Sequence, residues 1–142
     1  MRIGIDARKL HDFGIGTYIR NLLRQLARMD CQTEFVILCR PEDRETVAAL
    51  GDNFRAVVQT APNYSISEQL RIPLALAREG VTLFHAPHYV LPPLVRCKSV
   101  VTIHDCIHLM FPQYLPNRLA YSYARTSIRL AARRATRILT VS

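Results

Sequence analysis

The sequence predicts an α/β protein built on one doubly wound parallel sheet of about six strands. Short apolar runs rich in β-branched residues alternate with longer amphipathic segments, the pattern of parallel strands joined by helices. The clearest run, 99–103, ends abruptly at the polar pair His104 and Asp105. Ligands of open α/β folds bind beyond the carboxyl ends of the strands, so this pair is a first candidate for chemistry. We therefore expect a Rossmann-like fold.

Each predicted strand is short and mostly apolar, as expected for strands buried on both faces. The segments predicted as strands are 2–6, 34–39, 54–59, 81–85, 99–103 and 137–141. The proline-rich stretch between the fourth and fifth strands is expected to be irregular. The last strand should be internal in the sheet or nearly so, and we expect further protein to follow Ser142.

The intervening segments carry apolar residues at helical spacing. Those predicted as helices are 16–29, 41–50, 67–78 and 115–134. Pro41 suits the first turn of the second helix, whereas Pro73 should kink the third helix or begin its main part.

A length of 142 residues fits a single domain, 1–142, with a sizeable core. The apolar runs are too short to cross a bilayer, and the charged start does not resemble a secretion signal. We expect a cytoplasmic protein whose four unpaired cysteines (Cys31, Cys39, Cys97 and Cys106) are buried thiols rather than a disulfide framework.

The net charge of +8 permits three kinds of partner: nucleic acid, an anionic membrane surface and phosphorylated small molecules. Four arginines share one stripe of the last helix, namely Arg118, Arg125, Arg129 and Arg133. This stripe is either a solvated face or a contact with anionic lipid headgroups on the inner face of the cytoplasmic membrane. Nucleic acid is not expected, because aromatic residues do not interleave with the arginines and no binding module is present.

A glycine pair opens the first predicted helix in the stretch Gly14, Ile15, Gly16 and Thr17. Glycines allow close backbone approach, and the free N–H groups of a helix start bind phosphate. The stretch is neither the dinucleotide fingerprint nor a P-loop. The alternative is a flexible turn followed by a helix cap at Thr17.

Histidines follow the fourth and fifth predicted strands, which should bring His85 and His88 to the same rim as His104, Asp105 and His108. General acid–base chemistry, or hydrogen bonding to sugar hydroxyls and phosphate, suits neutral histidines. Two alternatives remain open. The cluster could bind a metal, or His85, His88 and His104 could be structural while Asp105 caps a turn.

Six ordered segments together resemble the N-terminal half of a family-four (group one) glycosyltransferase with the GT-B architecture. They are Arg2 to Arg8, Gly14 to Leu23, Phe84 to Pro87, Leu91 to Pro93, Val101 to Asp105 and Ile138 to Ser142. The set is most similar to bacterial mannosyltransferases of surface-polysaccharide assembly. One departure is that Ile15 separates two glycines that are adjacent in many relatives.

The resemblance implies retaining transfer of a hexose from a nucleotide diphosphate sugar to a glycan or lipid-linked acceptor, without a cofactor or required metal. It implies that the N-terminal half binds the acceptor, that Gly14 to Thr17 lie near the donor diphosphate, and that His104 and Asp105 are catalytic. The acceptor-side candidates are His85, His88, Tyr89 and His108.

A C-terminal donor-binding domain is absent from the sequence, so we expect the 142-residue chain alone to be inactive. Two other functions are compatible with the sequence. One is a non-enzymatic Rossmann module that binds phosphate or a membrane, and the other is a metal-dependent hydrolase that uses the histidines.

Overall fold

Six parallel strands form a single sheet in the order β3-β2-β1-β4-β5-β6. The computed structural model describes residues 1–141, except for the side chains of His108 and Pro112. The strands are β1 (Arg2–Asp6), β2 (Glu34–Cys39), β3 (Phe54–Val58), β4 (Leu83–Ala86), β5 (Lys98–Ile103) and β6 (Arg137–Thr140). This order is that of a Rossmann-type doubly wound sheet, so the predicted fold class is confirmed.

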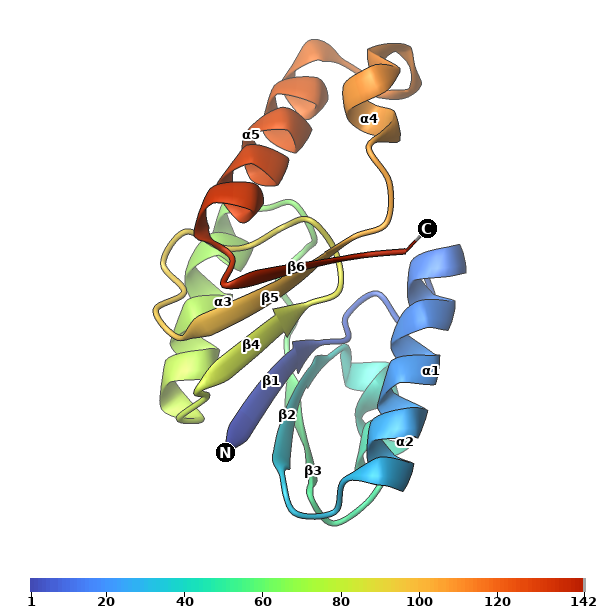
Figure 1. Ribbon diagram of the computed structural model, residues 1–142, viewed down its shortest axis with the longest axis vertical. Coiled ribbons are helices and arrows are strands. Elements are labelled where there is room, and N and C mark those ends of the chain that lie inside the picture. The colour runs from blue at the N-terminus through green and yellow to red at the C-terminus, as the bar shows by residue number, and fades with distance from the viewer. Residues whose placement is uncertain (142) are drawn as a thin grey trace.

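Helices cover both faces of the sheet, because right-handed crossovers from a central strand place them on opposite sides. They are α1 (Phe13–Met29), α2 (Arg44–Ala48), α3 (Ile66–Arg78), α4 (Ile107–Met110) and α5 (Arg118–Arg134), with single 3-10 turns η1 (Pro41–Asp43) and η2 (Pro112–Tyr114). Figure 1 shows α1 and α2 on one side of the sheet, and α3 and α5 on the other.

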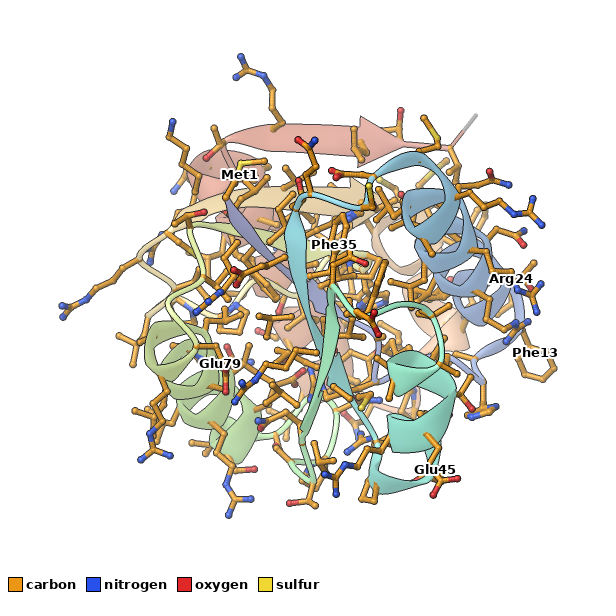
Figure 2. All side chains as sticks on the ribbon, turned by 90° about the horizontal axis from the view of Figure 1, so that it is seen from below. Met1, Phe13, Arg24, Phe35, Glu45 and Glu79 are labelled. Carbon is orange, nitrogen blue, oxygen red and sulfur yellow. The ribbon has the colours of Figure 1, made fainter. Side chains whose placement is uncertain are left out.

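Two apolar cores hold these layers together. On the α1 side, Ile19 and Leu23 pack with the inward residues of β1 and β2. Phe35 lies within this layer (Figure 2) and stacks on Phe54 with ring centroids 4.8 Å apart. On the other side, Ile72 of α3 and Ala131 of α5 belong to one buried cluster with residues of β2, β4 and β5.

The sheet order reverses between β1 and β4, which lie side by side at its centre. The chain moves from β1 outward through β2 to β3, then crosses back to β4 and moves outward through β5 to β6. Ile5 pairs with Ile37 on one side and with His85 on the other. The connections after β1 and β4 therefore leave the sheet in opposite directions and open a crevice at their carboxyl ends.

The observed boundaries correct several expectations. Helix α1 begins at Phe13 rather than near Gly16. Helix α5 begins at Arg118 rather than 115, because the Asn117 side chain caps it by accepting from Ala120 N at 2.8 Å. Helix α3 runs for seven residues before Pro73 and continues through it, so Pro73 does not begin its main part. Helix α4 and the turn η2 were not predicted.

The expected interior position of the last strand is wrong. Within residues 1–141, β6 pairs with β5 and forms the sheet edge, and all four of its residues are exposed. Its apolar composition suggested a buried strand, but no further strand or helix among the described residues covers it.

Candidate functional site

Polar side chains gather where the carboxyl ends of β1 and β4 diverge. A pocket of about 580 Å³ opens there, and we call it the rim pocket. It is formed by the loop after β1, the start of α1, and residues that follow β4 and β5: Lys9, His11, Asp12, Phe13, Gly14, Ile15, Tyr64, His88, His104 and Asp105. The fold therefore brings Gly14, Ile15, His88, His104 and Asp105 together, as the sequence predicted.

His104 is fixed by one hydrogen bond and one ring contact. Its Nε2 lies 3.0 Å from the carbonyl oxygen of Pro87. A carbonyl can only accept, so Nε2 carries the proton, and Nδ1 is the nitrogen available to a ligand when the ring is neutral. The ring of Tyr18 meets the His104 ring edge-on at 5.1 Å. The imidazole is thus oriented at the wall of the rim pocket.

Asp105 is exposed at the start of α4. One carboxylate oxygen accepts a hydrogen bond from Ile107 N at 3.0 Å. This local bond is the one expected if Asp105 caps a turn. Its carboxylate also lines the rim pocket, so the capping contact and a role toward a ligand are compatible.

His85 and His88 are neutral at physiological pH. Burial lowers the pKa of His85 to about 4 and that of His88 to about 3, with positive charge on neighbouring groups adding to the shift. His85 Nε2 bonds Thr102 Oγ1 at 2.8 Å within the sheet and lies outside the rim pocket lining. His88 lines the pocket, and its buried Nδ1 has no hydrogen-bond partner among the described residues.

These two histidines predict loss of stability in acid. Their pKa values in the folded chain lie below the ordinary 6.5, so below pH 6.5 the unfolded chain binds protons that the folded chain does not. Lowering the pH from 7 to 5 should reduce the free energy of unfolding by about 2 kcal/mol per histidine, and stability should not depend on these groups above pH 7. Urea unfolding at pH 7, 6 and 5 measures this. The His85→Gln variant should show a smaller loss, and equal stability at pH 7 and 5 in the parent would contradict the prediction.

The two glycines of α1 have different environments. Gly14 is exposed, and a Cβ atom there would meet nothing within 4 Å. Gly16 is buried, and a Cβ atom would collide with the carbonyl oxygen of Leu10. Gly16 is therefore required for packing of the helix on its own preceding loop, and it does not line the rim pocket. Thr17 lies in the second turn and donates to Phe13 O at 3.1 Å, so it is not the helix cap.

Alanine substitutions at the two glycines should have different effects on the free energy of unfolding. Gly16→Ala is expected to destabilise the chain by about 1–3 kcal/mol, because backbone atoms cannot move aside as a flexible side chain would. Gly14→Ala is the matched control, and it should be neutral or stabilising by up to about 1 kcal/mol because alanine favours the helix. Thermal and urea unfolding of both variants provide the measurement. Equal effects would show that the Leu10 contact does not constrain position 16.

A buried ion-pair network underlies the rim pocket. Arg8 lies 2.6 Å from an Asp6 carboxylate oxygen and 2.5 Å from one of Glu68, and its side chain is only 3% exposed. Burial would lower the pKa of Arg8, but the bonds and charges of Asp6 and Glu68 outweigh it and raise the pKa. The second Glu68 oxygen accepts from Tyr64 N at 2.6 Å. The network therefore connects the end of β1 to the loop that carries Tyr64.

Tyr64 has a positive φ of 63°, which is uncommon for a residue other than glycine. Its ring meets His88 and Tyr123 edge-on, each at 5.8 Å between centroids, and Lys9 Nζ lies 4.8 Å from the ring centre. The Glu68 bond holds the backbone in this conformation, which places the ring at the border of the rim pocket.

The remaining sequence candidates are distributed around this site. Tyr89 is buried beside His88, with ring centroids 3.9 Å apart. The side chain of His108 lies outside the described part of the chain. No group of three or more His, Cys, Asp or Glu residues among those described could hold a metal ion. All four cysteines are free, but Cys31 and Cys106 are exposed, so the prediction that all are buried is wrong.

A family model for glycosyltransferase family 4 matches residues 14–142. The chain belongs to this family. The match spans α1 through β6 and thus includes His88, His104 and Asp105, and it supports an N-terminal domain of the GT-B type. A comparison of this chain with curated proteins found no match. Sugar donor and acceptor substrates follow from the family, whereas mannose specificity does not.

Four residues in or beneath this site were not identifiable from the sequence pattern: Arg8, Glu68, Tyr64 and Lys9. One sequence signal pointed to the segment around Glu68: Ser65 and Glu68 have the spacing of a helix-capping box, which predicts the start of a helix there. Ser65 does cap α3 by accepting from Glu68 N at 3.1 Å. The Glu68 side chain instead reaches Arg8 and Tyr64 N, a long-range pairing that spacing does not predict.

Proposed function

We propose that this domain is the acceptor-side half of a retaining glycosyltransferase, which transfers a hexose from a nucleotide diphosphate sugar to a glycan or lipid-linked acceptor. A donor-binding half would complete the enzyme. The observation that carries the proposal is the rim pocket: in a family 4 domain, His88, His104 and the start of α1 face one space at the sheet switch point.

The start of α1 suits the donor diphosphate. Asp12 precedes the helix without a side-chain capping bond, so N–H groups of the first turn are not satisfied by a cap. Such groups and the helix dipole favour an anion. The Asp12 carboxylate opposes this, but Lys9 Nζ lies 2.7 Å from it and offsets its charge. Exposed Gly14 leaves the backbone open to a phosphate oxygen.

His104 is the residue that we assign to the reacting sugar. Its Nε2 bond to Pro87 fixes the ring, and a neutral His104 can accept a hydrogen bond from a sugar hydroxyl through Nδ1. Asp105 offers a carboxylate beside it. We assign no metal or other cofactor to the reaction, and positive groups of the donor-binding half would stabilise the leaving diphosphate.

The same proposal includes a cytoplasmic location with attachment to an anionic membrane. Residues 106–142 contain six arginines and no acidic residue. Arg118, Arg125, Arg129 and Arg133 are all exposed on α5. None of the described helices is long and apolar enough to cross a bilayer. Cosedimentation with phosphatidylglycerol vesicles, and its loss at high salt, tests this part.

A transfer assay on the protein that contains both halves tests the enzymatic part. The assay measures release of nucleoside diphosphate from a panel of UDP- and GDP-hexoses, with membrane lipid extract as acceptor. We expect transfer from one donor, with mannose as our proposed sugar, and retention of anomeric configuration. The 142-residue chain alone should give no turnover. Phosphate binding without transfer by the two-half protein would instead favour a binding module.

A further inference from the structure

A second hollow lies next to the rim pocket and has a different chemical character. Its volume is about 500 Å³. Its walls are aromatic and aliphatic: Tyr64, Tyr89 and Tyr123, with Leu115, Leu119 and Ala120, and neighbouring Pro116 and Ala124. Among the residues that the structure describes, those that line it include no charged side chain. We call it the tyrosine hollow.

The hollow and the rim pocket share a wall. Tyr64 lines both, and ring contacts continue from Tyr123 through Tyr64 to His88. The Tyr64 backbone is fixed by Glu68. A molecule that occupied the hollow would therefore end beside the space where His88 and His104 lie.

The lining favours hydrocarbon over a sugar ring or a phosphate. Phosphate groups and sugar hydroxyls need polar partners that fix their orientation, and no charged or amide side chain is among the described lining residues, which are tyrosines and aliphatic residues. The amide of Gln69 that approaches this wall donates to the Tyr123 hydroxyl at 3.1 Å and is already engaged. Burial raises the pKa of the Tyr89 phenol, in agreement with a dry wall.

The segment that leads into α5 suggests where the hydrocarbon comes from, since Leu115 and Leu119 of the hollow belong to it or follow it directly. Large apolar side chains are exposed along α4, η2 and the start of α5: Ile107, Met110, Phe111, Tyr114 and Leu119. Arg118 lies among these apolar residues, five further arginines follow along α5 and β6, and residues 106–142 contain no acidic residue. Exposed apolar residues flanked by basic ones are typical of surfaces that lie on an anionic bilayer.

We propose that the tyrosine hollow binds the aliphatic chain of a lipid acceptor, next to the rim pocket where its head group would receive the sugar. This inference rests on the proposed function for the identity of the ligand, but not for its binding. A chain in the hollow would gain free energy from burial of methylene and methyl groups against Tyr64, Leu119 and Ala120.

The test uses geraniol, a short prenyl alcohol, with the 142-residue chain. The chain has six tyrosines and no tryptophan, so ring-labelled tyrosine spectra resolve the site. Geraniol should shift the Tyr64, Tyr89 and Tyr123 signals in a saturable manner and leave Tyr18 unchanged. Ala120→Phe fills the hollow and should weaken binding at least roughly tenfold, since each buried methylene is worth about a fourfold change in affinity. Ala132→Phe, on the exposed side of α5, is the matched control and should bind as the parent does.

A second variant guards against misfolding of Ala120→Phe. Leu119 is 81% exposed, so Leu119→Ser cannot disturb the core, and it should weaken geraniol binding severalfold. Absence of saturable shifts, or equal binding by the parent and both hollow variants, would overturn the inference. Saturation by methyl mannoside instead would assign a sugar subsite, and a concentration-dependent dimer that Ala120→Phe dissociates would assign a contact between copies. Either outcome also overturns it.

The two proposals fail independently. If geraniol binds but the protein that contains both halves transfers no sugar, the proposal that the hollow binds an aliphatic chain stands and the enzymatic proposal fails. If sugar is transferred to a water-soluble glycan and geraniol does not bind, the enzymatic proposal remains and the hollow is not a lipid site.

Discussion

Replacing Arg8 by Met is expected to lower the free energy of unfolding by about 3–5 kcal/mol. The substitution keeps an unbranched apolar stem but leaves the Glu68 carboxylate, whose side chain is 5% exposed, without its buried cation. An unpaired charge in that position costs more than the ion pair contributes. Urea unfolding at pH 7 measures the change.

Arg2→Met is the matched control, because Arg2 pairs with Glu34 at the surface, where the two side chains are 41% and 60% exposed. Its loss should be below about 1 kcal/mol. The double variant Arg8→Met with Glu68→Gln should recover part of the stability, since it removes the stranded charge. Equal losses in the free energy of unfolding for Arg8→Met and Arg2→Met would show that the buried ion-pair network contributes no more stability than the surface pair.

His104→Ala is expected to reduce kcat of the protein that contains both halves by about 100-fold, the effect of removing one positioned group at a reacting centre. The fold should survive, because the ring lies partly exposed at the wall of the rim pocket. The melting temperature should therefore stay within a few degrees of the parent. Initial rates at saturating donor, with circular dichroism melting of the same samples, give both quantities.

Arg24→Ala serves as the control, because Arg24 projects away from the sheet on α1 (Figure 2). It should leave kcat unchanged. His104→Gln can still donate a side-chain hydrogen bond. If this variant partly recovers kcat, residue 104 acts by positioning other groups. If it recovers no kcat, the imidazole contacts the sugar directly. A His104→Ala rate within threefold of the parent would remove His104 from the mechanism.

Much of the fold was predictable because its determinants are local or periodic. Buried parallel strands carry continuous apolar runs, and helical spacing placed Arg125 and Arg129 on one stripe of α5, which is exposed in the structure. The rim pocket followed from the same logic, because the carboxyl ends of parallel strands meet at one edge. His104 could thus be placed near Gly14 without coordinates.

The rest depends on contacts that sequence spacing does not encode. Arg8 meets Glu68 sixty positions away, and the second Glu68 oxygen accepts a hydrogen bond from Tyr64 N. The two glycines look alike in sequence, yet only Gly16 lies against the Leu10 carbonyl. The tyrosine hollow needs Tyr64, Tyr89 and Tyr123 from three separate segments. No single periodicity could have indicated that they share one wall.

The exposed position of β6 has a practical consequence for any preparation of this chain. Edge strands present unpaired N–H and C=O groups to solvent, and these groups can pair with another chain. Ile138 and Leu139 remain more than two-fifths exposed there, and Phe13 at the start of α1 is 97% exposed and projects from the molecule (Figure 2). We therefore expect association of chains through this edge at high concentration, and a charged substitution such as Leu139→Lys should reduce it.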